Sequence, residues 1–237
     1  MQRLDVRRQY PLTIIMGDLN GLKLANDLFG HQAGDRLLCK IADILRQETR
    51  KEDIVARWGG DEFAIILPVT SEATGEEIRT RILKACAAAE ASPIQPNIAL
   101  GIATKTGDSQ NLKDVFEQAE DGMYRHKLLE GRNSRDIIVA SLNEAMSDKE
   151  NGAFDHSIQL VDLASELGKA AMLSNAELKS LNLLAKLHDL GKKIIPESIL
   201  KKQGKLTGEE WEIMKMHPEK GSQIAESTKM LSFISEY

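Results

Sequence analysis

The chain has 237 residues, of which 42% are hydrophobic and 28% charged, which is typical of a folded globular protein with one large domain or two small ones. Its formal net charge of −5 argues against a nucleic-acid partner bound through a broad basic face. No apolar run approaches the roughly 18 residues of a membrane span, and the N-terminus lacks the apolar core of a signal peptide. We therefore expect a cytoplasmic protein, or the cytoplasmic part of a longer sensor protein.

The first 140 residues alternate strand-like and helix-like patterns. The expected elements, in chain order, are a strand over 11–17, a helix from 25 that breaks at Gly30 and resumes over 35–49, a β-hairpin over 53–67, a helix over 72–90, a strand over 97–104, a helix over 112–129 and a short strand over 136–140. Because this order mixes a hairpin with crossover helices, it predicts an α+β fold with a central, mostly antiparallel sheet and flanking helices. Cys39 and Cys86 lie in helix-like apolar stretches and are expected to be buried thiols.

The pattern changes after Ala140. From 141 to 237 the chain is helix-like throughout, without a convincing strand. The polar, glycine-ended segment 147–152 is a plausible join between domains. We expect two domains, one over residues 1–140 and an all-helical one over 141–237.

The segment RWGGDEF, residues 57–63, is the most informative motif in the chain. Two adjacent glycines between apolar runs indicate a hairpin, because only glycine takes positive φ without steric cost. Asp61 and Glu62 then lie at its tip, where neighbouring carboxylates repel unless a cation or solvent screens them. If the first strand pairs with the hairpin, Asp18 joins these acids, and such hard oxygen ligands favour Mg²⁺ or Mn²⁺. The alternative for the hairpin alone is an ordinary acidic turn.

Polar residues suited to a nucleotide follow Asp18. Lys23 lies on the same loop and can meet phosphate charge. Asn26 and Asp35 can read a base edge, since an amide and a carboxylate match the donors and acceptors of guanine. The backbone at Gly60 allows a ligand to approach closely. The sequence thus predicts a metal-bound nucleotide near the hairpin.

These motifs together resemble the GGDEF family, the diguanylate cyclases. They occur in the family's order and spacing across about residues 1–138: DLNGLK at 18–23, ND at 26–27, GHQAGD at 30–35 and GGDEF at 59–63. The resemblance implies a GGDEF or nucleotidyl-cyclase-like fold. It also implies that the 3′-hydroxyl of one GTP attacks the α-phosphate of a second, so that two attacks yield cyclic di-GMP and two pyrophosphates. Because each subunit of the family holds one substrate, it implies a homodimer.

The resemblance also implies roles for individual residues. The metal ligands would be Asp18, the Leu19 carbonyl, Asp61 and Glu62. The guanine would be bound by Asn26 and Asp35, with Gly60 against the substrate. The triphosphate charge would be neutralised by Lys23, Lys127 and Arg132, of which Lys23, like Asp61 and Glu62, belongs to the catalytic set.

A second motif stands upstream of the hairpin. Arg50 and Asp53 have the RxxD spacing that resembles the family's product-inhibition site, where arginine meets phosphate or guanine and aspartate accepts from the base. Arg81 falls where a second inhibitory arginine is often found. The alternative for these residues is a surface ion pair. The resemblance implies that cyclic di-GMP is both product and inhibitor.

The chain departs from the family pattern in three places. Asn20 replaces a common acid, which removes one charge but should not abolish metal binding. The spacing from Lys127 to the GRN segment at 131–133 is one residue longer than in the usual family pattern. The chain begins after the point where the family's opening helix would lie, so we expect that helix to be missing and part of the sheet face to be uncovered.

The helical half resembles the HD-GYP branch of the HD phosphohydrolases. The matching segments are HDLGK at 188–192, IP at 195–196, SIL at 198–200, GKL at 204–206, EW at 210–211 and MHPEKG at 216–221. The resemblance implies Fe or Mn that activates water against the phosphodiester of cyclic di-GMP, with Lys192 stabilising phosphate charge. The implied ligands are His156, His188, Asp189 and His217. The alternative for each histidine singly is a hydrogen-bonded surface or core residue.

Tyr237 precedes the paired histidines, the later aspartate and the GYP loop of that family, so we expect a C-terminally truncated, inactive hydrolase half. The leading interpretation is a diguanylate cyclase with an incomplete HD-GYP module. One alternative is a cyclic di-GMP phosphodiesterase whose GGDEF part only regulates it. Another is a non-catalytic receptor that binds GTP or cyclic di-GMP through Arg50 and Asp53. The presence of Asp18, Asp61 and Glu62 favours catalysis.

Overall fold

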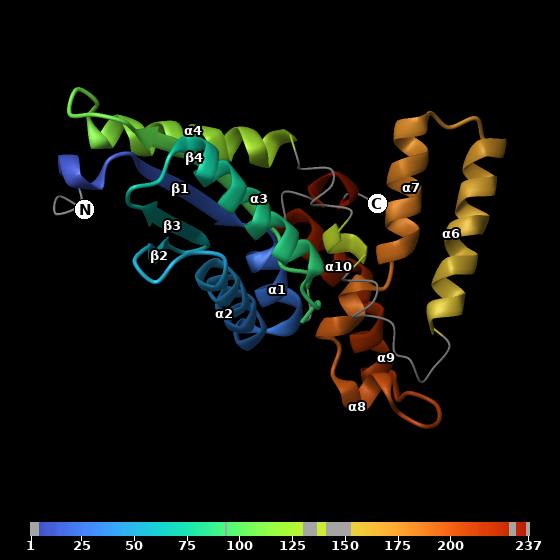
Figure 1. Ribbon diagram of the computed structural model, residues 1–237. Coiled ribbons are helices and arrows are strands. Elements are labelled where there is room, and N and C mark those ends of the chain that lie inside the picture. The colour runs from blue at the N-terminus through green and yellow to red at the C-terminus, as the bar shows by residue number, and fades with distance from the viewer. Residues whose placement is uncertain (1–4, 93, 130–136, 141–152, 228–230, 236–237) are drawn as a thin grey trace. The chain divides into compact units, whose positions relative to one another are not determined.

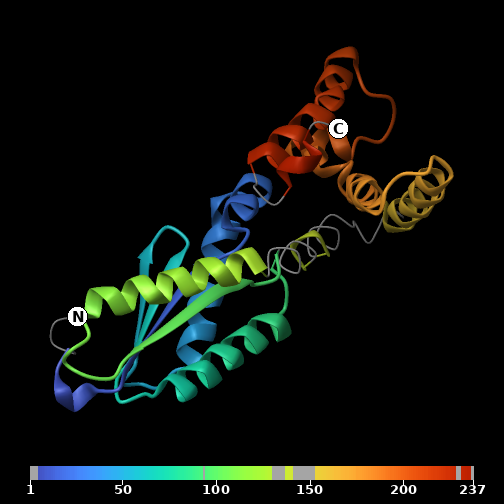
Figure 2. The same cartoon turned by 90° about the horizontal axis from the view of Figure 1, so that it is seen from above.

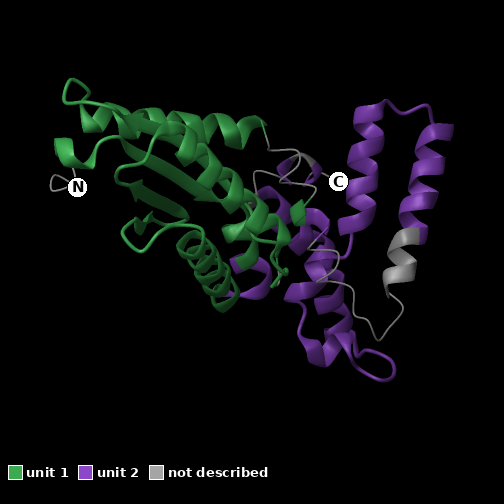
Figure 3. Cartoon of the chain, in the orientation of Figure 1, with its two compact units in different colours: residues 1–25, 31–138 green, residues 26–30, 139–237 purple. Residues whose placement is uncertain are grey.

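The computed structural model describes residues 5–92, 94–129, 137–140, 153–227 and 231–235. The chain divides into two compact units, shown in Figure 3. The first comprises residues 1–25 and 31–138, and the second comprises residues 26–30 and 139–237.

The first unit is built around a four-stranded sheet (Figure 1). In spatial order the strands are β2 (Ile54–Gly59), β3 (Glu62–Leu67), β1 (Leu12–Leu19) and β4 (Ile98–Lys105). All three neighbouring pairs are antiparallel, which confirms the predicted α+β fold with a mostly antiparallel sheet. Strand β1 lies at the centre and is buried along almost its whole length, because both faces of the sheet are covered by helices.

Helices cover the sheet on its two faces (Figures 1 and 2). The helices of this half are α1 (Leu22–Phe29), α2 (His31–Gln47), α3 (Glu72–Ala88) and α4 (Leu112–Leu129), preceded by a 3-10 turn, η1 (Arg7–Gln9). Helix α4 packs on the face that carries Ile14 and Met16. Helix α3 packs on the opposite face, where a Cβ built on Gly75 would lie 2.7 Å from Thr13 Cγ2. Successive residues of β1 thus alternate between the two helical layers, as the period of a strand requires.

Local sequence signals explain where the helices begin and which side is buried. Gly30 has φ of +80° and separates α1 from α2, because this conformation suits glycine and interrupts the helix. Ser71 caps α3 by accepting a hydrogen bond from the backbone N–H of Thr74. In α2 the buried side chains recur at helical spacing, which seats the helix on the core. They are Ala33, Leu37, Leu38, Ile41, Ile44 and Leu45.

The short strand predicted at 136–140 is wrong, because residues 137–140 are helical and Asp136 lies outside the described residues. Ile138 and Val139 are buried, with exposed fractions of 2% and 5%. A Cβ built on Gly21 would lie 3.1 Å from Ile138 Cδ1, so a helical turn already buries the apolar run. A short apolar run fits a buried strand or a buried helical turn equally well, which is why the sequence pattern misled.

The prediction that both cysteines are buried is half wrong. Cys86 is buried, with an exposed fraction of 3%, whereas Cys39 is exposed. Both thiols are free. The helical period of α2 turns Leu38 and Ile41 inward and leaves Cys39 on the outer side.

Every regular element among the described residues of the second unit from 153 onward is a helix. Its elements are α6 (Ala153–Ala170), α7 (Asn175–Leu187), η2 (Leu190–Ile194), α8 (Glu197–Leu200), α9 (Gly208–Lys215), α10 (His217–Ser227) and η3 (Ser232–Ile234). Capping boxes begin α7 at Ser174 and α9 at Thr207. No helix within the described ranges is both long and apolar enough to cross a membrane.

Candidate functional site

The RWGGDEF segment forms the predicted hairpin, with Gly60 and Asp61 in the turn between β2 and β3. Gly60 has φ of +48°, which explains why glycine is needed there. The Arg57 guanidinium holds the turn by donating from Nε to the Gly60 carbonyl at 2.8 Å. A Cβ built on Gly59 or Gly60 would meet nothing within 4 Å, so the turn is open to a ligand. Sequence reasoning assigned no role to Arg57, although its place in the motif was the available signal.

Strand pairing brings the acidic hairpin to the end of β1. Asp18 lies opposite Glu62 in the antiparallel register of β1 and β3. The backbone N–H of Leu19 donates to the Asp61 carbonyl at 2.9 Å. The expectation that the first strand pairs with the hairpin is therefore confirmed, and the four residues predicted as metal ligands share one end of the sheet.

Asp18 is a largely buried carboxylate that forms an ion pair with Lys127. Its side chain is 13% exposed, and the Lys127 ammonium donates to Oδ1 at 2.5 Å. Burial raises the pKa of the Asp18 carboxyl; Lys127 opposes this shift and the charge of Asp61 adds to it. The site thus disfavours a lone negative charge on Asp18 and favours a neighbouring cation.

The donor set fits a divalent cation by charge and chemistry. The Asp18 carboxylate, the Leu19 carbonyl and the hairpin acids Asp61 and Glu62 are hard oxygen donors of the kind that Mg²⁺ and Mn²⁺ prefer. Lys127 supplies the positive charge at Asp18 in this structure. Among the side chains that the structure describes, no group of three or more His, Cys, Asp or Glu is spaced to hold a metal ion.

The residues predicted to bind the nucleotide fall on two helices. Lys23 and Asn26 lie on α1, and Asp35 lies on α2 after the break at Gly30. Lys23 and Asp35 are exposed, whereas Asn26 is half-buried. Arg132 lies outside the described residues.

The departure at Asn20 has a structural role. This residue is 7% exposed, and its amide donates from Nδ2 to Asn97 Oδ1 at 2.6 Å. Its backbone N–H donates to the Asn97 carbonyl at 2.9 Å. Asn20 therefore ties the loop after β1 to the start of β4, and its side chain is used for that contact.

The RxxD residues form a local turn. Asp53 Oδ2 accepts the backbone N–H of Arg50 at 2.7 Å, and the N–H of Asp53 donates to the Arg50 carbonyl at 3.1 Å. The other carboxylate oxygen, Oδ1, is buried and has no hydrogen-bond partner within the described part of the chain. Burial raises the pKa of Asp53, and Arg50 opposes that shift. Asp53 thus keeps one buried acceptor oxygen unsatisfied, which is uncommon in folded proteins.

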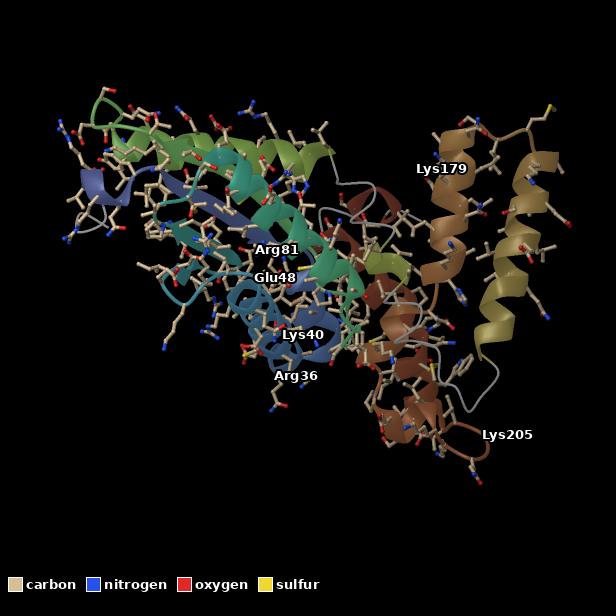
Figure 4. All side chains as sticks on the ribbon, in the orientation of Figure 1. Arg36, Lys40, Glu48, Arg81, Lys179 and Lys205 are labelled. Atoms are coloured by element: carbon tan, nitrogen blue, oxygen red, sulfur yellow. The ribbon has the colours of Figure 1, made fainter. Side chains whose placement is uncertain are left out.

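Arg81 reaches the same turn from α3. Its guanidinium donates to the Glu48 carbonyl at 2.6 Å and to the Glu48 carboxylate at 3.1 Å, and Figure 4 shows the two side chains side by side. Glu48 lies two residues before Arg50, so the structure brings Arg81 to the segment that carries Arg50 and Asp53. Sequence reasoning missed Glu48, and no motif would have indicated it.

The second unit contains a compact cluster at the end of α7. Asp189 Oδ2 lies 2.8 Å from Lys192 Nζ and 3.3 Å from His188 Nε2. The hydrogen bond with Asp189 raises the pKa of His188, although burial opposes it. Burial acts to raise the pKa of Asp189, but His188 and Lys192 together hold it well below its usual range. The predicted His188, Asp189 and Lys192 are therefore in contact as one charged group.

The remaining predicted ligands of this unit are His217 and His156. His217 Nδ1 lies 2.8 Å from the Met214 carbonyl, as His188 Nδ1 does from the Ala185 carbonyl, an arrangement that fixes a ring for ligation through Nε2. A Cβ on Gly191 would lie 1.8 Å from the His217 carbonyl oxygen, so η2 and α10 touch backbone to backbone. His156 lies on α6, and its side chain is outside the described part of the structure.

The fold and the acidic hairpin define a nucleotidyl-cyclase-like domain followed by a helical module. Residues 1–134 match the family model described as diguanylate cyclase, GGDEF domain, and residues 138–237 match an HD domain model. The first match covers more than half of the chain, which therefore belongs to the GGDEF domain family. The predicted order of a GGDEF domain and an HD domain is confirmed.

Two curated relatives and one solved structure illustrate the similarity. Diguanylate cyclase DgcM of Escherichia coli (strain K12) is 35% identical over 134 residues, which are 56% of this chain and 32% of that protein. Diguanylate cyclase A of Treponema denticola is 32% identical over 136 residues, 56% of this chain and 36% of that protein. The chain thus spans about a third of the length of these relatives. The active GGEEF domain of a diguanylate cyclase from Vibrio cholerae is 26% identical with a TM-score of 0.47, over 52% of this chain and 80% of that one.

Proposed function

We propose that this chain is a diguanylate cyclase that condenses two GTP into cyclic di-GMP and two pyrophosphates. The observation that carries the proposal is the strand register that sets Asp18 opposite Glu62 and joins Leu19 to Asp61. This arrangement places acidic oxygens beside an open glycine turn, which suits a metal-bound triphosphate.

The roles of the residues follow from charge and position. Asp18, the Leu19 carbonyl, Asp61 and Glu62 would hold Mg²⁺ or Mn²⁺, which would neutralise phosphate charge and polarise the phosphoryl group. Lys127 exchanges its contact with Asp18 for a phosphate oxygen, and Lys23 and Arg132 meet the remaining phosphate charge. Asn26 and Asp35 orient the guanine by hydrogen bonds to its edge. The open backbone at Gly60 admits the phosphates closely.

Catalysis in this proposal requires a homodimer, because each subunit holds one GTP and the two must face each other. The 3′-hydroxyl of one GTP then forms a bond to the α-phosphate of the other, and pyrophosphate leaves. Sedimentation of the protein with and without nucleotide tests this part. A monomer that makes cyclic di-GMP at a rate proportional to its concentration contradicts it.

Product inhibition is proposed at Arg50, Asp53 and Arg81. The unpartnered Oδ1 of Asp53 supports this assignment, since a guanine N–H can satisfy it once the turn opens and exposes the atom. Arg81 is held next to this turn by Glu48 and offers a guanidinium for phosphate. A receptor that binds cyclic di-GMP here without catalysis is the alternative within the same unit.

A second candidate function is metal-assisted phosphodiester hydrolysis in the HD unit. The contact of His188, Asp189 and Lys192 favours it, because it combines two metal-ligating groups with a phosphate-binding cation. Fe or Mn is the metal that the resemblance implies, with His156 and His217 as further ligands. Hydrolysis of cyclic di-GMP by this chain with Mn²⁺ or Fe²⁺, lost in His188→Ala, would support it.

The test of the cyclase proposal is incubation of the folded protein with GTP and Mg²⁺, with the products resolved by chromatography. We expect cyclic di-GMP and pyrophosphate to form, and ATP to give no cyclic product because adenine lacks the donors and acceptors that Asn26 and Asp35 match. Absence of cyclic di-GMP from a folded dimer rules out the cyclase for this chain.

A further inference from the structure

Strand β4 closes the described sheet on one side, and its outer edge is covered at one residue by two side chains. The backbone N–H of Leu100 donates to His126 Nδ1 at 3.0 Å. The carbonyl of Leu100 accepts from Arg79 Nε at 3.2 Å. His126 comes from α4 and Arg79 from α3, so helices on opposite faces of the sheet meet at one edge residue. Such bonds satisfy backbone groups that no strand pairs.

The bond fixes the protonation state of His126. A backbone N–H can only donate, so Nδ1 must carry a lone pair and the ring is neutral with its proton on Nε2. His126 lines a cavity together with Asn20, Gln95 and Asn97. Cys86 lines the same cavity, and burial raises the pKa of its thiol to about 12, so it stays neutral.

Helix α4 contacts the backbone of the sheet just before His126. A Cβ built on Gly101 of β4 would lie 2.0 Å from the Met123 amide nitrogen, so the two backbones are in direct contact. Gly122 on α4 faces Gly101 in the same way, with a Cβ distance of 3.3 Å to the Gly101 Cα. The next turn of the helix carries His126, so its bond to Leu100 extends this contact by one turn.

The residue after His126 is Lys127, which holds the Asp18 carboxylate at 2.5 Å. Leu100 lies opposite Gly17 in the register of β4 and β1, and Gly17 precedes Asp18. Two adjacent residues of α4 thus contact two adjacent strands, one at the sheet edge and one at the candidate metal site. Lys127 lies in the last turns of α4, and helix ends fray. The hydrogen bond of the adjacent His126 to Leu100 therefore limits how far the Lys127 ammonium can move from Asp18.

We infer that His126 is a positioning residue, which fixes the last turns of α4 to Leu100 so that Lys127 is held at the Asp18 end of the site. This inference rests on the proposed function insofar as Lys127 binds the triphosphate there. His126 acts through Lys127 and touches neither metal nor nucleotide.

Three variants separate this role from a general loss of structure. His126→Leu removes the acceptor and keeps an apolar side chain of similar size. His126→Asn restores an acceptor, because its Oδ1 is bonded to Cγ as His Nδ1 is. Arg79→Met is the matched control, since it also removes one hydrogen bond from Leu100 but from α3, which does not carry Lys127. If His126→Leu fails to fold, His126→Gln replaces it, because its acceptor lies one bond further out.

The first measurement is hydrogen exchange of the Leu100 amide by NMR, which needs no activity. We expect exchange about tenfold faster in His126→Leu, corresponding to loss of one hydrogen bond, and near wild-type exchange in His126→Asn. An unchanged Leu100 amide in a folded His126→Leu protein overturns the anchor itself.

The second measurement is the affinity for a non-hydrolysable GTP analogue with Mg²⁺, by calorimetry, in a double-mutant cycle with Lys127→Met. We expect about fivefold to tenfold weaker binding in His126→Leu, little change in His126→Asn and Arg79→Met, and no further loss when His126→Leu is added to Lys127→Met. Additive losses, or an equal loss in Arg79→Met, overturn the inference. If no variant or wild type makes cyclic di-GMP, the proposed function fails, while the exchange and binding cycle still decide the role of His126.

Discussion

The two candidate sites of this protein are assembled in different ways. In the GGDEF unit, Asp18 and Glu62 are 44 positions apart along the chain (62 minus 18) and meet only through the register of β1 and β3. In the HD unit, His188, Asp189 and Lys192 lie within five consecutive residues and meet through one helix end. The first site therefore depends on the whole sheet, whereas the second depends on a local backbone shape.

The largest effect is expected from removing one acid of the candidate metal site in the GGDEF unit. Asp61→Ala is expected to lower the rate of cyclic di-GMP formation by at least about a thousandfold, because a lost metal ligand removes several kcal/mol of transition-state stabilisation. The fold should persist, since the Asp61 carbonyl that accepts from Leu19 belongs to the backbone. The rate is measured by chromatography and the fold by circular dichroism. Glu117→Gln, an exposed acid on α4, is the control, and an equal loss there contradicts the assignment.

The dependence on the sheet predicts that a change in the packing of α4 on β4, at a residue that is not an acid, destabilises the unit that holds the first site. Gly101→Ala should destabilise the unit by about 3 kcal/mol, because its Cβ would lie 2.0 Å from a helix backbone atom and α4 must move. Gly60→Ala should cost only about 1 kcal/mol, since its Cβ has open space and the cost is the positive φ alone. Denaturant unfolding measures both. Equal costs would show that α4 is not packed on β4 as described.

The RxxD turn is formed by consecutive residues, although it belongs to the unit whose other site depends on the sheet. We therefore expect that a substitution in this turn can abolish product inhibition without affecting catalysis. Arg50→Ala should raise the inhibition constant of cyclic di-GMP about tenfold, because one charged hydrogen-bonding partner is lost. The initial rate should be unchanged. Initial rates with and without added cyclic di-GMP measure both quantities, with Arg46→Ala, an exposed arginine of α2, as the control. A fall in the initial rate would mean that the turn also supports the catalytic end.

The smallest effect is expected from a substitution in the cluster of His188, Asp189 and Lys192 in the HD unit, and it concerns the pH dependence of stability. The hydrogen bond with Asp189 raises the pKa of His188 above its ordinary value of 6.5, so in metal-free protein this pair adds stability below about pH 6.5. That stability is lost as pH rises through the raised pKa of the folded state. Asp189→Asn should lower the pKa of His188 and flatten this dependence, without changing the GGDEF unit. NMR titration and thermal unfolding between pH 5 and 9 measure it, and an unchanged His188 titration rules out the pair.

Sequence patterns predicted the local features well. The helix at 112–129 was predicted with the bounds that α4 has, and the hairpin glycines identified the turn at Gly60 and Asp61. The contact of Asp189 with Lys192, which the sequence analysis did not predict, is also local, since residues three apart share a helix side. These signals were readable because each depends on a few consecutive residues.

Features that depend on long-range packing were beyond the sequence. The apolar run at 137–140 gave no sign that burial against Gly21 would favour a helical turn over a strand. Nothing in the sequence paired Lys127 with Asp18, or Arg81 with Glu48, because each contact depends on how a helix crosses the sheet. Sequence motifs thus identified which residues belong to the candidate sites. Which residues contact one another there depends on the sheet register and the helix packing.

We propose that a divalent cation binds where β1 meets the hairpin, and paramagnetic broadening of amide signals by Mn²⁺ detects such an ion. Substoichiometric Mn²⁺ added to isotope-labelled protein broadens signals near the bound ion before others. We expect the amides of Asp18, Leu19, Asp61 and Glu62 to broaden first, and Asp61→Ala to abolish this. Broadening that leaves these four amides sharp and begins at another place in the GGDEF unit would contradict it.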